Sequence, residues 1–125
     1  MSKLIFFVDD DKMIINLLEY TFQSRHQYDV RSFESGEDCL DSLKLNPDLI
    51  VLDHQLAGAG ESKMDGIETL EKIKSRNANL PVIVLTAYGS DELYEEFLKK
   101  GAERFLTKDD YFIDSLIETI GEVLN

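Results

Sequence analysis

The chain has 125 residues, of which 43% are hydrophobic and 30% charged, enough for one domain with a buried core. Its net charge of −12 disfavours direct nucleic-acid binding, which requires clustered Lys and Arg, and adhesion to anionic membranes. The apolar runs are about five residues long, far short of the ~20 residues of a membrane helix, so no membrane insertion is expected.

The N-terminus shows no signal-peptide pattern, and Cys39 is the single cysteine, so it has no partner for an internal disulfide. Both features favour a cytoplasmic location. Cys39 itself is expected to be a small core residue, because no His or Cys lies near it in sequence to activate a thiolate.

The first half of the chain alternates between strand and helix patterns. Residues 4–8 are continuously apolar, as in a strand buried on both faces, and Asp11 can cap a following helix. Residues 28–33 alternate in polarity, which is typical of an edge strand. The apolar face expected for the first helix consists of Ile14, Leu17, Leu18, Thr21 and Phe22.

The same alternation continues to the end of the chain. A short helix through residues 40–44 should stop before Asn46-Pro47, since a residue preceding proline avoids the helical region. Ser90 can cap a helix that ends at Gly101. The remaining strands are expected at residues 49–52, 82–85 and 105–106, and the remaining helices at residues 67–74 and 113–124.

Five strands alternating with five helices predict an α/β fold. Right-handed crossovers, with the most apolar strands at the centre, favour a flavodoxin-like, doubly wound parallel sheet of order 2-1-3-4-5. The first, third and fourth strands are the most apolar. We expect one domain over residues 1–125, with no further output domain.

Four of the apolar runs end on residues suited to a cation and a phosphoryl group. Asp9 and Asp10 follow the first run, and Asp53, Thr86 and Lys108 follow the third, fourth and fifth. The carboxyl ends of parallel strands meet at one edge, where ligands bind. Carboxylates suit Mg²⁺, whereas zinc would need His or Cys ligands. A carboxylate such as Asp53 can also act as a nucleophile toward phosphorus.

The segments LIFFVDDD, DLIVLD, VIVLTA and RFLTK, in this order, resemble the receiver domain of two-component response regulators. The resemblance covers the whole chain. It implies that Asp53 accepts a phosphoryl group from a sensor histidine kinase or a phosphotransfer protein. It also implies a Mg²⁺ or Mn²⁺ ion held by Asp9, Asp10, Asp53 and the main-chain carbonyl of Gln55.

The resemblance further implies a switch. Thr86 and Lys108 would bind the phosphoryl group, and Phe105 would be the switch aromatic. The surface of the fourth helix, fifth strand and fifth helix would then change and bind an output protein, unknown from sequence, or a second copy of the chain. Such a domain assists only its own phosphorylation and dephosphorylation and is not otherwise an enzyme.

The chain departs from the family pattern beside the site. Ala57 replaces a proline, and Asp65-Gly66 follows Asp53 by twelve residues instead of seven, so the loop at residues 56–64 is five residues longer. It is either a flap beside the site or a tolerated surface insertion. Asp109 replaces the proline after Lys108, which predicts a trans peptide bond between them.

Three further residues lie beside the expected site. Gln55 and Tyr88 occupy positions that tune the access of hydrolytic water in receivers; a bulky Tyr88 would shield an acyl phosphate, or would serve as an interface aromatic. His54 follows the acceptor but points away from it on a strand, which favours packing or a helix-facing hydrogen bond over a role as base.

Three other functions fit the architecture. A pseudo-receiver would bind partners without phosphorylation; the complete set of acidic residues and lysine argues against it, while the long loop keeps it open. An aspartyl-phosphate phosphatase typically needs a second acid where Gln55 stands. A flavin-binding electron carrier needs a Ser/Thr/Gly-rich phosphate loop, and the acidic segment DDDKM would repel the flavin phosphate.

Overall fold

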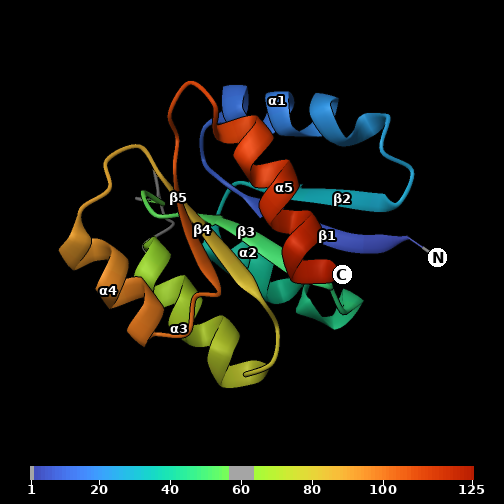
Figure 1. The fold of residues 1–125 in the computed structure, drawn as a ribbon. Helices are drawn as coiled ribbons and strands as arrows, with labels where there is room; N and C mark the ends of the chain where they lie inside the picture. Colours follow the sequence, from blue (N-terminus) through green and yellow to red (C-terminus); the bar gives the residue numbers. More distant parts are fainter. Residues whose placement is uncertain (1, 57–63) are drawn as a thin grey trace.

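The computed structural model describes residues 2–56 and 64–125, and within them five parallel strands form one sheet of order β2-β1-β3-β4-β5 (Figure 1). The strands are β1 (Lys3–Val8), β2 (Tyr28–Phe33), β3 (Leu49–Asp53), β4 (Val82–Thr86) and β5 (Arg104–Thr107). The helices between and after them are α1 (Lys12–Gln23), α2 (Gly36–Asp41), α3 (Gly66–Arg76), α4 (Asp91–Lys99) and α5 (Phe112–Leu124). The predicted fold class and strand order are confirmed.

The burial of the strands follows their place in the sheet. Every residue of β3 and β4 is buried, as are the last four residues of β1, whereas β2 and β5 at the edges keep exposed positions. Continuous apolar runs therefore mark strands covered on both faces, and the alternating run marks an edge. This confirms the prediction that the first, third and fourth strands are central.

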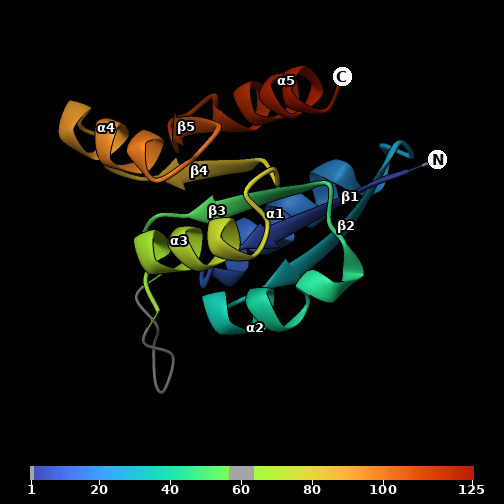
Figure 2. The same ribbon diagram turned by 90° about the horizontal axis from the view of Figure 1, so that it is seen from below.

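Two apolar layers form the core, one on each face of the sheet. Ile5 and Phe7 of β1 pack with α1 and α5, while Phe6 and Val8 pack on the opposite face with α2, α3 and α4. Figures 1 and 2 show these two groups of helices on either side of the strands. Successive side chains of a strand point to opposite faces, so one apolar segment supplies both layers.

Side chains cap the helices at the positions that the sequence predicts. The Asp11 carboxylate accepts a hydrogen bond from the Met13 amide at 2.9 Å, and the Ser90 hydroxyl accepts one from the Leu93 amide at 3.2 Å. Each cap satisfies an amide that the helix leaves unpaired. Gly101 follows α4 with a φ of 102°, a conformation that glycine adopts without strain.

The structure corrects the rotation of α1. Its buried residues are Ile15, Leu18 and Phe22, whereas Leu17, expected on the buried face, is 41% exposed. The sequence carries apolar residues at 13–15, 17 and 18, which form a broad stripe compatible with more than one rotation. Packing against Phe7 of β1 selects the rotation, since the rings of Phe7 and Phe22 lie 5.3 Å apart.

The expected helix at residues 40–44 is two elements in the structure. α2 ends at Asp41, where the amide of Ser42 bonds back to the carbonyl of Cys39, and a 3-10 turn follows at Leu43–Leu45. Asn46 then adopts a left-handed conformation, with φ 57°, directly before Pro47. The chain thus leaves the helical region before the proline, as predicted, but with a tighter last turn.

Cys39 is fully buried in α2, as expected of a core residue. Burial raises the pKa of its thiol to about 12, so the reactive thiolate is scarce at neutral pH. None of the helices in the described part of the chain is both long and apolar enough to cross a bilayer.

Gly36, the first residue of α2, has no room for a side chain. A Cβ at this position would overlap the hydroxyl oxygen of Thr69, which is fully buried in α3 and bonds to the Asp65 carbonyl at 2.7 Å. We predict that Gly36→Ala lowers the free energy of unfolding by about 1–3 kcal/mol, as overpacking does, measured by urea denaturation.

Gly121→Ala is the matched control, because the nearest atom to a Cβ there is Asn125 Nδ2 at 3.9 Å. Gly121 lies inside α5, where alanine is the better helix former, so this change should raise the free energy of unfolding by about 0.5–1 kcal/mol. Equal effects of the two substitutions on the free energy of unfolding would show that the contact with Thr69 does not restrict the size of the side chain at position 36.

Candidate functional site

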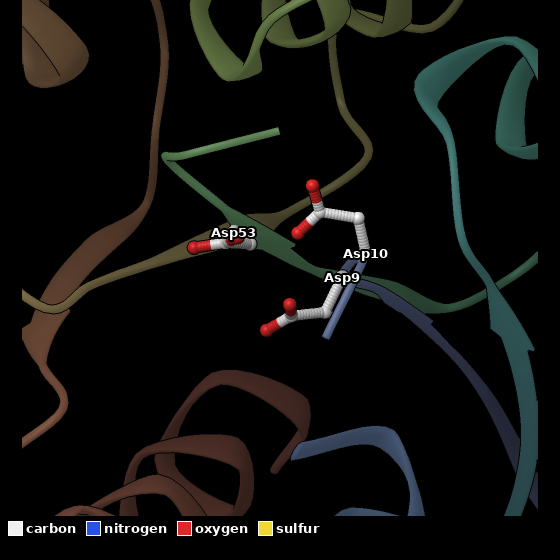
Figure 3. Close-up of side chains that lie close together, drawn as sticks. All are labelled: Asp9, Asp10 and Asp53. Atoms are coloured by element: carbon white, nitrogen blue, oxygen red, sulfur yellow. The ribbon is translucent and has the colours of Figure 1, made fainter. Parts of the chain in front are cut away.

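The residues expected at one edge of the sheet do meet there. Asp9 and Asp10 follow β1, Asp53 ends β3, Thr86 ends β4 and Lys108 follows β5. The register brings these strand ends level, with Val8 opposite Leu52 and Asp53 opposite Leu85. Figure 3 shows the three aspartates grouped at the ends of β1 and β3.

Lys108 joins two buried carboxylates. Its Nζ lies 2.8 Å from Asp9 Oδ2 and 3.2 Å from Asp53 Oδ1, and these aspartates are only 2% and 3% exposed. Burial alone would lower the pKa of Lys108, but the hydrogen bond to Asp9 and the charge of Asp53 outweigh it, so the pKa is raised. The side chain therefore stays an ammonium.

The three carboxylates form a potential cation site. Ligand oxygens of Asp9, Asp10 and Asp53 all lie within 4.8 Å of one another. One ammonium balances one of the three negative charges, which leaves a surplus that a divalent cation would neutralise. Oxygen ligands of this kind suit a hard cation, so the residues present fit such an ion.

The electrostatics of Asp9 and Asp10 reflect this crowding. Burial raises the pKa of Asp9, the hydrogen bond from Lys108 lowers it and the charge of Asp53 raises it, with a net upward shift. Burial and the charge of Asp9 likewise raise the pKa of Asp10. Asp9 Oδ1 also accepts the Asp11 amide at 2.9 Å, so both of its oxygens have partners in the protein.

Thr86 lies fully buried beside these acids. Its hydroxyl oxygen is 3.2 Å from the Tyr88 amide, which donates to it, and 3.1 Å from His54 Nδ1. The His54 ring also packs edge-on against Phe97, with centroids 5.3 Å apart. The predicted packing role of His54 is confirmed, but the sequence did not reveal its hydrogen bond to Thr86, because the two residues are 32 positions apart.

Hydrogen bonds hold the turn after Lys108. The described residues contain no cis peptide bond, so Lys108–Asp109 is trans, as predicted. The Lys108 amide donates to the Thr86 carbonyl at 2.7 Å, and the Asp109 carboxylate accepts the Tyr111 amide at 2.9 Å. An acidic side chain thus stabilises a turn where a proline was expected from the family pattern.

Phe105 lies half-buried within a group of aromatic rings. Its centroid is 5.6 Å from those of Phe97 and Tyr94, and Tyr94 is 46% exposed. Tyr88 is 77% exposed, a position that leaves both shielding and partner binding open to it. The expected roles of Gln55, Tyr88 and Phe105 stay predictions.

The ends of the long loop are fixed in the core. Leu56 and Met64 are 2% and 9% exposed and belong to the apolar layer beside α2, α3 and α4. The alternatives of a flap and a surface insertion concern residues 57–63, which lie outside the described residues.

Gly66 positions the start of α3 against the end of β3, a role that sequence reasoning missed. A Cβ at Gly66 would lie 2.6 Å from the His54 carbonyl oxygen and 2.9 Å from that of Asp53. Only glycine allows the helix this close to the main chain beside Asp53. The sequence contains the displaced Asp65-Gly66 pair of the family pattern. Only the packing shows why a glycine is needed there, because its main chain lies against those of Asp53 and His54.

Comparison with known proteins decides the family. The family model "Response regulator receiver domain" matches residues 5–120. The chain belongs to this family. The receiver resemblance is thereby confirmed, and the acidic pocket is that of a phosphoaccepting signalling module, not of a catalytic enzyme. The alternative of an aspartyl-phosphate phosphatase, which Gln55 already disfavours in the sequence, is thereby excluded.

Individual relatives agree with this assignment. Sporulation initiation phosphotransferase F of Bacillus subtilis is 33% identical, over 99% of this chain and 95% of that protein. The alkaline phosphatase synthesis transcriptional regulatory protein PhoP of the same organism is 37% identical over 86% of the chain, and the match spans 43% of PhoP. The structure of the BeF3-activated DrrB receiver domain superposes with a TM-score of 0.85 at 28% identity, over 99% of this chain and 98% of that one.

Membership of the receiver family implies a phosphodonor, either a histidine kinase or a phosphotransfer protein. The acidic triad of this receiver can bind a metal ion of the kind typical of the family.

The raised pKa values predict that cation binding depends on pH. Because Asp9 and Asp10 retain their protons to a higher pH than ordinary aspartates, protons compete with the cation over that range. The apparent affinity for Mg²⁺ should fall as the pH drops through these raised values, by up to about tenfold per pH unit for each competing proton. Calorimetric titrations at several pH values would measure this, and proton release would appear as buffer-dependent heats.

Asp10→Asn provides the comparison, since it removes one ligand and one proton competitor while leaving the Lys108 bridge intact. The affinity of this variant for Mg²⁺ should be weaker than that of the unaltered protein at every pH, and it should depend less on pH. An affinity for the unaltered protein that stays constant down to about pH 5, as ordinary aspartates would give, would contradict the prediction.

Proposed function

We propose that this receiver accepts a phosphoryl group on Asp53 with the help of Mg²⁺ or Mn²⁺, and that phosphorylation changes the surface of α4, β5 and α5. The observation that supports it most is the position of Asp53. It ends the central strand β3, between the cation ligands after β1 and the Thr86 hydroxyl at the end of β4, and it bonds to Lys108.

Asp53 is the best nucleophile of the three acids. Both oxygens of Asp9 already accept hydrogen bonds, from Asp11 and Lys108. Among the side-chain hydrogen bonds of the described residues, the Asp53 carboxylate takes part in one, through Oδ1 to Lys108. Oδ2 therefore remains available to attack phosphorus, with transfer of the phosphoryl group to the carboxylate and departure of the donor imidazole with its bonding electrons.

The remaining residues would position and neutralise the phosphoryl group. Asp9, Asp10, Asp53 and the main-chain carbonyl of Gln55 would hold the cation, which when bound offsets negative charge on a phosphoryl oxygen. Lys108 would exchange its contact with Asp53 for one with a second oxygen. The Thr86 hydroxyl would donate a hydrogen bond to a third.

The aromatic residues around β5 support a change at the surface. Phe105 contacts Phe97 inside and the partly exposed Tyr94 outside, so a movement of Phe105 would reach solvent. Tyr88 and Tyr111 expose 77% and 74% of their surface on the loops nearby. We infer that an output protein, or a second copy of the phosphorylated chain, binds here. The acidic net charge favours a protein partner over nucleic acid.

The phosphodonor would be a sensor histidine kinase or a phosphotransfer protein. We place the protein in the cytoplasm, where a buried free thiol such as Cys39 stays reduced.

The test is incubation with Mg²⁺ and a small acyl phosphate, followed by intact-mass measurement. We predict one acid-stable, base-labile phosphoryl group per chain, and none on Asp53→Asn. Lys108→Met should slow phosphorylation by about 100-fold or more, because it removes a charge aimed at the reacting group.

The control is Glu71→Gln, which removes the exposed ion pair between Glu71 and Lys100 at 3.2 Å, away from the site. It should be phosphorylated at the normal rate. Failure of both the acyl phosphate and beryllofluoride to modify the unaltered protein would instead favour a pseudo-receiver that works without phosphorylation.

A further inference from the structure

The hydroxyl of Thr86 is already engaged before any phosphoryl group arrives. It accepts the Tyr88 amide at 3.2 Å, is placed to donate to the Tyr88 carbonyl at 3.2 Å, and lies 3.1 Å from His54 Nδ1. In either tautomer of His54 this contact fixes the hydroxyl, because Nδ1 either accepts its proton or donates to its oxygen. None of the hydrogen bonds among the described residues joins Thr86 to Asp53.

Packing holds the His54 ring in place for this contact. The ring stands edge-on to Phe97 at 88° with centroids 5.3 Å apart, and Phe97 is fully buried. The His54 amide donates to the Leu85 carbonyl at 2.7 Å, which fixes the main chain between β3 and β4. The imidazole is thus a rigid partner for Thr86 and not a freely rotating surface group.

With a phosphoryl group on Asp53, the Thr86 hydroxyl would have two competing partners, a phosphoryl oxygen and His54. A hydroxyl that donates its one proton to a phosphoryl oxygen on Asp53 cannot also give it to His54 Nδ1 or to the Tyr88 carbonyl, so its present contacts would have to change. We propose that His54 is a positioning residue that holds Thr86 in the unphosphorylated arrangement and so weakens engagement of the switch. This inference rests on the proposed function of Asp53 and Thr86.

His54 also contacts the aromatic group that contains the expected switch residue. Phe97 touches His54 on one side and Phe105 on the other, with ring centroids 5.3 and 5.6 Å apart. A movement of Thr86 and His54 would therefore change the packing of Phe105 through the ring of Phe97. The residue directly after the acceptor thereby joins the phosphoryl site to the surface near Tyr94, which packs on Phe105 at 5.6 Å.

Two substitutions separate the ring of His54 from its hydrogen bond. His54→Phe keeps an aromatic ring against Phe97 but removes the partner of Thr86, whereas His54→Asn keeps a polar atom near the place of Nδ1 and removes the ring. The measurement is the affinity for beryllofluoride at saturating Mg²⁺, followed by NMR shifts of the Thr86 and Phe105 amides.

We expect His54→Phe to bind beryllofluoride about two- to tenfold more tightly than the unaltered protein, the range that corresponds to one net hydrogen bond. His54→Asn should stay close to the unaltered protein. A shift in His54→Asn but not in His54→Phe would assign the effect to ring packing and would overturn the proposal.

Thr86→Val shows whether the effect passes through the hydroxyl. In a double-mutant cycle, His54→Phe should change the affinity in the Thr86 background and leave it unchanged in the Val background. An equal gain in both backgrounds would show that His54 acts on the adduct by another route, and the proposal would be wrong.

The contact itself can be observed without phosphorylation chemistry. In the metal-free protein, Thr86→Val should shift the Nδ1 resonance of His54, because the bond at 3.1 Å is lost. An unchanged resonance would overturn the role of His54 whatever Asp53 does. A shifted resonance together with no adduct on Asp53 would instead place the failure in the proposed function, on which the inference rests.

Discussion

The ammonium of Lys108 lies between the carboxylates of Asp9 and Asp53, at 2.8 and 3.2 Å, at an edge where both acids are almost completely buried. Two buried carboxylates without a counter-charge would repel each other and resist ionisation. Lys108 is 99 residues from Asp9 in sequence, so the contact also connects the end of the first strand, β1, with the end of the last strand, β5. β5 thus delivers the positive charge that offsets the repulsion between these two carboxylates.

The contacts around Lys108 also prepare the site for a cation and a phosphoryl group. With one positive charge against three negative ones, the site keeps a surplus that favours a cation. Lys108 holds Asp53 through a single oxygen, and within the described residues no other hydrogen bond to this carboxylate occurs. Behind the acids, Gly66 brings α3 against the main chain of Asp53 and His54, and Thr86 is held by His54 and Tyr88. These contacts fix Asp53 and Thr86, the two residues that a phosphoryl group would contact in the proposed function.

The departures from the family pattern occur in the connections, while the strands and their terminal residues follow it. The longer segment after Asp53 begins and ends at Leu56 and Met64, which are both buried in the core. After Lys108, the Asp109 carboxylate caps the turn that a proline would otherwise stiffen.

The sequence by itself determined the strand order and the identity of the clustered residues, because continuous apolar runs require central parallel strands and their carboxyl ends must meet. It also located the caps Asp11 and Ser90, whose hydrogen bonds are local. Only the tertiary structure decided the rotation of α1, the need for Gly66 and the contact between His54 and Thr86. These depend on residues far apart in sequence that packing brings within a few ångströms, and no local pattern encodes such distances.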